Sequence, residues 1–512
     1  MGEVGYKTLA IDIETFSDVD LIKCGVYAYA DSPAFEILLF AYSFDDEETK
    51  IIDLAQGEQL TEEIKNALSD VGIIKTAFNA NFERTCLSKY MGVRLSPESW
   101  VCTAVQSAML ALPLSLEGVG AVLGLSEQKL KEGKDLIRYF CVPCKPTKTN
   151  GGRSRNLPCH APEKWEQFKT YCIRDVDVEK GIRQKLHKFP IPESEMAFYR
   201  LDQEINDRGV LVDRELVEQS ITCDLLHKDI VTNRAYEVTG LENPNSVSQL
   251  KGWLSERGVE IDSLSKGAVA ELIEDADGEV LEASASAMFG VPIEEITKGS
   301  PLRQKGKIAE LALGYGGAVG ALTSMGALAM GLSEEELPGL VSTWRNANPH
   351  ITQFWWDVDE AAVRAVRERK ETQVGLIRFQ YASGILFAML PSGRKLAYVK
   401  PRMGVNKYGR DGLTYEGVGE NKKWERMDTY GPKLVENIVQ GTSRDILAEA
   451  MMRLKKAGFS IVFHVHDEAV LEVPEGESSV EEVCRIMAEQ PSWVHGLPLR
   501  ADGYECQFYK KD

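Results

Sequence analysis

The segment TLAIDIETFSD, which begins at Thr8, constrains the fold of this chain more than any other, because it predicts a buried strand that carries charge. Leu9 and Ile11 are apolar, whereas Asp12 and Glu14 share one face of the strand because side chains alternate along it. Two neighbouring carboxylates repel each other unless cations lie between them. Divalent cations that bind both reacting oxygens of a phosphodiester need three or four carboxylates from different elements.

Further candidates for such a site follow along the chain. FNANFERTCL places Glu83 near a predicted helix start, and YCIRDVDVEK places Tyr171 and Asp175 one helical turn apart, on one helix face. A lone Asp-x-Glu is a weak signal, and a Tyr four residues before an Asp is typical of surface or core. In this order, however, these residues together indicate a metal-dependent site.

On these residues the N-terminal segment resembles the DEDD-type 3′-5′ exonucleases of the tyrosine subclass, as found in proofreading domains. The resemblance implies an RNase H-like α/β domain over residues 1–188. It also implies that two Mg²⁺ or Mn²⁺ ions are held by four carboxylates: Asp12, Glu14, Glu83 and Asp175. Tyr171 would help to orient the attacking water. Glu83 stands where the family usually has Asp, and we expect its longer side chain to reach the same place.

A hairpin is predicted near the C-terminus, in GFSIVFHVHDEAVLEVP. Apolar residues alternate on both sides of a tight turn. The tip consists of His466, Asp467 and Glu468. Carboxylates at a rigid tip are well placed to bind a metal ion, and the alternative is a solvated turn.

Two predicted helices carry candidate nucleotide and DNA contacts. In SPLRQKGKIAELALGYGG every fourth residue forms a stripe that ends before Gly316: Arg303, Lys307, Leu311 and Tyr315. Its cationic half can bind a triphosphate while the ring and the glycine lie against a base pair. The alternative is an exposed basic turn joined to a core stripe. In ENIVQGTSRDILAEAMMRL, Asn437 and Gln440 share a face that could contact the minor groove.

In their order along the chain, the helix that carries Arg303, the helix that carries Asn437 and the hairpin that carries Asp467 resemble family A DNA polymerases of the phage type. The resemblance implies fingers and a partial palm over residues 283–512, after a helical linker and thumb-base remnant over residues 189–282. It implies that a primer 3′-OH attacks the α-phosphate of a deoxynucleoside triphosphate, with Asp467 and Glu468 in the palm and His466 near the nucleotide. Primer-template DNA and single-stranded 3′ ends would be the partners. Leu311 stands where the family usually has an aromatic residue.

The polymerase pattern is incomplete. A second palm carboxylate, in a motif resembling D-x-S-x-I-E, should precede the fingers helix, but the chain runs from AELIEDADGEVLE directly into ASAMFGVP. Asp277 and Glu282 have the D-x4-E spacing, yet Asp277 lies 26 positions before Arg303, about half the usual gap, and DADGEV favours a turn. We interpret the junction as an internal deletion. Asp467 alone cannot hold two cations against their hydration, so we expect polymerisation to fail and the exonuclease to survive.

Three functions stay open at this point: a proofreading DNA polymerase, an exonuclease whose C-terminal half only binds DNA, and a DNA-binding remnant without activity. The net charge of −19 argues against a nucleic-acid partner, but the acid-free segments KPTKTNGGRSRN and RKLAYVKPRMGVNKYGR suit phosphate contacts.

Composition supports a cytoplasmic monomer. No membrane span is expected, because the uncharged run over residues 311–332 is rich in glycine. The ten cysteines fit a reducing compartment. Cys141, Cys144 and Cys159 have a spacing that could hold zinc, and the alternative is a set of ordinary thiols.

Overall fold

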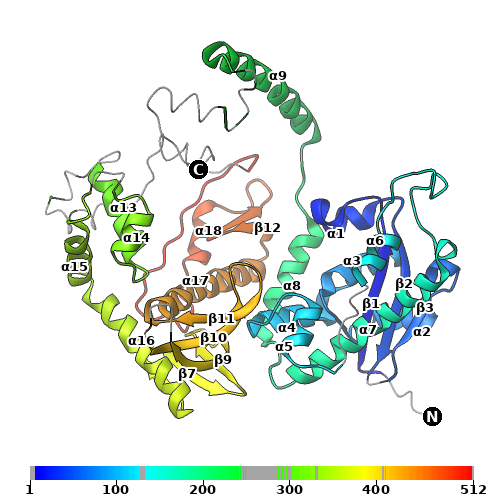
Figure 1. Cartoon of the computed structure of the whole chain (residues 1–512), viewed down its shortest axis with the longest axis horizontal. Helices are drawn as coiled ribbons and strands as arrows, with labels where there is room; N and C mark the ends of the chain where they lie inside the picture. The colour runs from blue at the N-terminus through cyan, green and yellow to red at the C-terminus, as the bar shows by residue number, and fades with distance from the viewer. Residues whose placement is uncertain are drawn as a thin grey trace. The chain divides into compact units, whose positions relative to one another are not determined.

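The computed structural model describes residues 6–45, 47–126, 133–241, 243, 246, 248–249, 286, 291–292, 296, 301–328, 332–405, 409 and 411–509; the side chains of 301–305 and 307 are not described. It divides into two compact units, and Figure 1 labels elements of both. The first combines Met1–Arg208 with Asp357–Asp512, and the second is Gly209–Trp356. The first unit therefore joins the N-terminal carboxylates and the C-terminal hairpin in one body.

A five-stranded sheet forms the N-terminal part of the first unit. Its strands are β1 (Thr8–Phe16), β2 (Glu36–Phe44), β3 (Lys50–Asp53), β4 (Ile74–Ala77) and β5 (Trp100–Cys102). Their order is β3-β2-β1-β4-β5, with β1, β2 and β3 antiparallel and with β4 and β5 parallel to β1. This is the RNase H-like arrangement that the sequence predicted, and it puts β1 at the centre.

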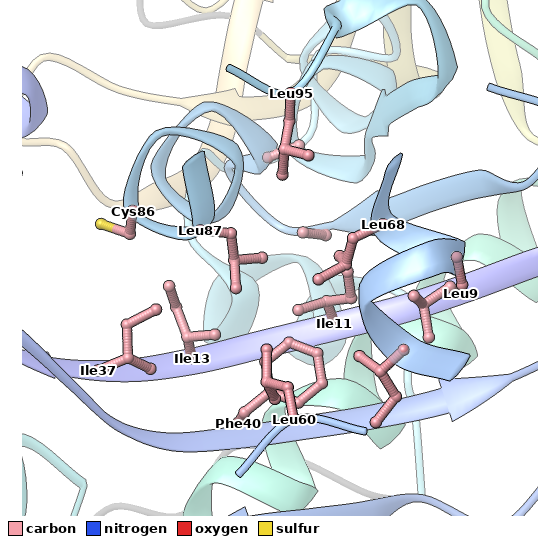
Figure 2. Packing of buried hydrophobic residues seen from close by; sticks show 14 of the residues in the cluster. Leu9, Ile11, Ile13, Ile37, Phe40, Leu60, Leu68, Cys86, Leu87 and Leu95 are labelled. Atoms are coloured by element: carbon pink, nitrogen blue, oxygen red, sulfur yellow. The ribbon is translucent and has the colours of Figure 1, made fainter. Parts of the chain in front are cut away.

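Helices cover both faces of this sheet. On one face, Leu9, Ile11 and Ile13 of β1 pack with α2 (Glu62–Ser69) and α3 (Ala80–Met91), in the cluster that Figure 2 shows. On the other face, Ala10 packs with α6 (Gly133–Phe140) and α7 (Pro162–Leu186). Because side chains alternate, the even-numbered carboxylates of β1 lie on the face that α7 covers.

Shorter elements complete this part of the first unit. They are the helices α1 (Leu21–Asp31), α4 (Thr103–Met109), α5 (Leu116–Val122) and α8 (Glu193–Arg208), and the 3₁₀ turns Leu54–Gln56, Pro97–Ser99 and Pro158–His160.

A six-stranded antiparallel sheet follows in the C-terminal half, and the sequence did not predict it. Its strands are β6 (Thr372–Val374), β7 (Ile377–Ala382), β8 (Ile385–Met389), β9 (Lys395–Val405), β10 (Asp411–Val418) and β11 (Trp424–Thr429). Phe387 and Val399 share a buried cluster with Val119 of α5 and Ile182 of α7. The sheet and the N-terminal domain thus have a common core.

The predicted hairpin is present as β12 (Ser460–Val465) and β13 (Glu468–Glu472). It packs with α17 (Gly431–Lys456) and α18 (Val480–Met487). Leu201 and Ile205 of α8 contribute to this cluster. Among the described residues, β12 and β13 pair only with each other.

The second unit is helical. It contains α9 (Arg214–Thr239), α13 (Pro301–Leu313), α14 (Val319–Ser324), α15 (Leu337–Ala347) and the start of α16 (Pro349–Glu368). Trp344 donates a 2.8 Å hydrogen bond to Glu310 and stacks on Trp355, with ring centroids 5.9 Å apart. Across the described residues, no helix combines the length and the apolar character that crossing a membrane requires.

Candidate active site

The first two candidate ligands lie on β1, at the centre of the N-terminal sheet. Asp12 is half-buried and Glu14 is buried, and both face α7. The pairing of β1 with β2 shifts register between Glu14 and Thr15. Such a bulge bends a strand and changes the direction of its side chains, and bulges are common beside active sites.

Glu83 lies in the first turn of α3. Asn79, in the left-handed region at φ 79°, turns the chain from β4 into this helix. The Glu83 side chain is 4% exposed, and its Oε2 has no hydrogen-bond partner among the described residues. Burial raises the pKa of the Glu83 carboxyl well above its usual range, and the charge of Asp12 raises it further. A buried carboxylate oxygen of this kind, close to a second carboxylate, fits a cation site.

The helix α7 supplies Tyr171 and Asp175, and both side chains are buried. Tyr171 stacks on Phe168, with ring centroids 6.1 Å apart. Burial raises the pKa of Tyr171, and the charges of Asp175, Glu14 and Asp12 add to the effect. The phenol therefore lies among three of the four predicted ligands.

A glycine that the sequence analysis missed makes room for this phenol. A Cβ atom on Gly133 of α6 would lie 2.0 Å from Cε2 of Tyr171, far inside any contact distance. Gly133 therefore allows α6 to approach the ring closely.

Two cysteine thiols lie beside the carboxylates of β1. Cys172 Sγ is 3.5 Å from Oδ2 of Asp12, and Cys141 Sγ is 3.8 Å from Oε2 of Glu14. Burial raises the pKa of both thiols well above the usual range, and the nearby carboxylates raise it further. Within the described part of the chain, the ligand atoms of Asp12, Glu14 and Cys172 form the group that could hold a metal ion. The sequence offered one signal for Cys172, its position next to the candidate residue Tyr171. Nothing in the sequence indicated that its thiol would lie beside Asp12 of β1.

The three thiols whose spacing could hold zinc have different surroundings in the structure. Cys144 Sγ lies 3.4 Å from the carbonyl oxygen of Arg153, whereas Cys141 lies beside Glu14, and Cys159 is exposed. The metal-ligand group found in the described residues includes none of these three thiols.

The hairpin tip differs from this enclosed site. His466 has φ 53°, and His466, Asp467 and Glu468 are all exposed. Neither of these carboxylates belongs to a group of three candidate ligands within the described ranges. Asp277 and Glu282 fall outside those ranges. The structure thus brings the N-terminal carboxylates together and leaves Asp467 at an exposed turn.

The fingers-like helix is present as α13 but is shorter than the predicted stripe. It ends at Leu313, so Tyr315 lies in the following turn, beside Gly316 with φ 77°. Leu311 and Tyr315 are 45% and 47% exposed. The side chains of Arg303 and Lys307 are not among those described.

The two amides of α17 have different surroundings. Asn437 donates a 3.1 Å hydrogen bond to the Tyr398 hydroxyl of β9, whereas Gln440 is exposed. Gln440 is thus the more exposed of the two, and Asn437 is partly buried beside β9.

Phage DNA polymerases are similar to this chain in sequence. The chain is 46% identical to the DNA polymerase of Bacillus phage SP02, in an alignment over 648 residues that covers 99% of this chain and 100% of the relative. The chain belongs to the phage DNA polymerase family. A second phage DNA polymerase, from Mycobacterium phage D29, is 25% identical over 211 residues, which are 40% of this chain and 26% of the relative. No protein-family model matches the chain.

A solved structure resembles the fold of this phage DNA polymerase homologue. It is the polymerase domain of Pol1 from M. smegmatis, in complex with DNA primer-template and dNTP. The match has a TM-score of 0.51 at 14% identity and covers 94% of this chain and 91% of that chain. At this identity the similarity supports the fold alone.

The alignment with the SP02 polymerase is much longer than this chain. It runs over 648 positions, whereas the chain has 512 residues, a difference of 136. Many positions of the relative therefore stand opposite gaps in this member of the phage DNA polymerase family.

Proposed function

We propose that this protein removes nucleotides from the 3′ ends of DNA as a two-metal exonuclease, and that its family A polymerase half binds DNA without extending it. The observation that carries the proposal is the difference between the two candidate sites. Asp12 and Glu14 lie close together, and Glu83 is buried where the charge of Asp12 acts on its carboxyl, whereas Asp467 lies exposed at a hairpin tip.

The N-terminal site has the ligands that the reaction needs. Mg²⁺ prefers carboxylate oxygens, and when bound it would supply charge for the attacking and leaving oxygens of the phosphodiester. Asp12, Glu14, Glu83 and Asp175 would hold it, and the buried Oε2 of Glu83 supports this assignment. Tyr171 lies near Asp12, Glu14 and Asp175, so its hydroxyl is suited to orient the attacking water.

Among the described residues of the C-terminal half, Asp467 is our candidate for one of the two carboxylates that a polymerase palm requires. The described strands β12 and β13 form a sheet of two, without the neighbouring strand on which the second carboxylate would lie. The excess length of the SP02 alignment supports an internal deletion, which we place between Glu274 and Pro292.

A complete proofreading DNA polymerase is the second candidate, and the identity of 46% along the whole SP02 relative favours it. In that case Asp277 would be the missing palm ligand. In either case we expect the deletion to leave the N-terminal site intact, because all five predicted exonuclease residues precede it in the chain.

The experiment uses a 5′-labelled primer annealed to a longer template, with Mg²⁺, with and without the four deoxynucleotides. We expect shortening under both conditions and none with Asp12→Ala, while Asp467→Ala serves as the matched control and should shorten the primer normally. Extension by the wild type would contradict the proposal and support the second candidate. Shortening that survives in Asp12→Ala would overturn the exonuclease assignment.

A further inference from the structure

We propose that Cys172 makes the exonuclease site a mixed carboxylate and thiolate site that binds thiophilic divalent cations of the Zn²⁺ class, and that such binding stops DNA degradation. The inference rests on the proposed exonuclease function, because it concerns the same carboxylates. It adds a sulfur ligand and a class of inhibiting cation, and catalysis with Mg²⁺ requires neither of them.

The first argument is the distance between sulfur and oxygen. A tetrahedral zinc ion with sulfur at about 2.3 Å and oxygen at about 2.1 Å separates these two ligands by about 3.6 Å. In the structure, Cys172 Sγ and Asp12 Oδ2 are 3.5 Å apart. The two atoms therefore already have the spacing of one edge of a zinc tetrahedron.

The second argument is that a further donor, Glu14, lies close to these two atoms. The ligand atoms of Asp12, Glu14 and Cys172 all lie within 4.8 Å of one another. Glu83 adds a buried oxygen, Oε2, with no hydrogen-bond partner among the described residues, and Asp12 is the charge that acts most strongly on its carboxyl. One sulfur and two carboxylates therefore offer three protein ligands to a cation of the Zn²⁺ class.

The class of cation follows from the donor set. Mg²⁺ takes oxygen ligands in an octahedral arrangement and does not bind sulfur well, whereas Zn²⁺ and Cd²⁺ bind thiolates strongly. When the metal–sulfur bond forms, the S–H bond of Cys172 breaks and its proton passes to the solvent. A cation held by Cys172, Asp12 and Glu14 would occupy two carboxylates that Mg²⁺ needs, so it would keep Mg²⁺ out of the site and stop degradation.

Access to the site is consistent with this proposal. Asp12 is half-buried, so a cation can enter from its side, while Glu14 and Cys172 are buried. The thiol of Cys172 is reduced, as are all ten cysteines of the chain.

The decisive experiment titrates the full-length, metal-stripped protein with Cd²⁺ and follows the ultraviolet charge-transfer absorption of cadmium thiolate. Cys172→Ala and Cys172→Ser are compared with the wild type, and Cys102→Ala is the control because Cys102 is also buried but lies at the end of β5. We expect both Cys172 variants to lose one cadmium-thiolate band and Cys102→Ala to keep it.

The affinity for Cd²⁺ should fall by at least about 100-fold in the Cys172 variants, since the loss of even an outer-shell partner costs roughly 10- to 100-fold. Zn²⁺ should inhibit degradation by the wild type at lower concentrations than degradation by Cys172→Ser, with each protein compared with its own activity in Mg²⁺ alone. Cadmium-thiolate absorption that is equally strong in the wild type and in both Cys172 variants would overturn the inference. A wild type that shows the band but never degrades DNA would instead contradict the proposed function and leave the ligand assignment standing.

Discussion

Arg84 of α3 and Asp207 of α8 form a buried ion pair with two parallel hydrogen bonds, of 2.7 Å and 2.8 Å. Their side chains are 2% and 6% exposed. Tyr27 donates a further hydrogen bond of 2.7 Å to Asp207. Arg84 directly follows Glu83, so this pair ties the helix that carries a candidate metal ligand to the helix that ends the N-terminal segment of the first unit.

Replacing Asp207 with Asn should destabilise the first unit by about 3–5 kcal/mol, because it leaves a buried guanidinium without its counter-charge. We also expect slower DNA degradation, since α3 would no longer be held in place next to Glu83. Urea unfolding and primer shortening measure the two effects. Asp31→Asn is the control, because Asp31 pairs with Lys89 at the exposed end of α3 and should change neither quantity. Equal stability of Asp207→Asn and the wild type would contradict the prediction.

Replacing Gly133 with Ala should displace the Tyr171 ring, because the new Cβ would lie 2.0 Å from it. Overpacking of this kind costs about 1–3 kcal/mol, and the moved hydroxyl should slow DNA degradation strongly. Gly339→Ala on α15 is the matched control, since nothing lies within 4 Å of its Cβ and a helical alanine is favoured by about 0.5–1 kcal/mol. Normal degradation by Gly133→Ala would show that the phenol position is not needed.

Lys75 should make the stability of the protein depend on pH above neutrality. The side chain is buried in β4 and donates a 2.6 Å hydrogen bond to the carbonyl oxygen of Asp70, and burial lowers the pKa of Lys75 to about 8. Between about pH 8 and 10.4, the unfolded chain holds a proton that the folded chain has released, so the contribution of Lys75 to stability rises with pH.

Lys75→Met should remove this rise and should be more stable than the wild type at pH 7, where the buried charge is unfavourable. Urea unfolding at several pH values from 7 to 10 measures the difference. Lys65→Met, which changes a partly exposed lysine of α2, should follow the wild-type profile. A constant difference between Lys75→Met and the wild type over this range would contradict the prediction.

Inserting the segment that we propose to be deleted should give the protein DNA synthesis. We expect a chimaera in which residues 274–292 are replaced by the aligned segment of the SP02 polymerase to extend a primer, because β12 would regain a neighbouring strand and Asp467 a second carboxylate. The extension should disappear when Asp467→Ala is added. A folded chimaera that extends equally well with Asp467→Ala would contradict the assignment of the hairpin to the palm.

Local pattern was enough to predict the elements that carry the candidate site. The alternation of β1 placed Asp12 and Glu14 on one face, and helical spacing placed Tyr171 and Asp175 together on α7. The hairpin around Asp467 was equally clear. These predictions depend on periods of two and 3.6 residues, which neighbouring residues determine by themselves.

The six-stranded sheet from β6 to β11 could not be predicted in the same way. In the sequence, residues 394–410 stood out only for their positive charge. In the structure, most of this segment is the strand β9, and its buried face packs on the N-terminal domain. That packing partner lies some two hundred residues earlier in the chain, so no local window contains the information.

The sequence by itself therefore determined the types of the main elements and the carboxylates that they carry. The tertiary structure alone decided which other residues reach the site: Cys172 beside Asp12, Gly133 against Tyr171 and Arg84 bound to Asp207. These contacts join side chains from different elements. Their distances depend on how the helices pack on the sheet, which is the combined result of burial across the whole core.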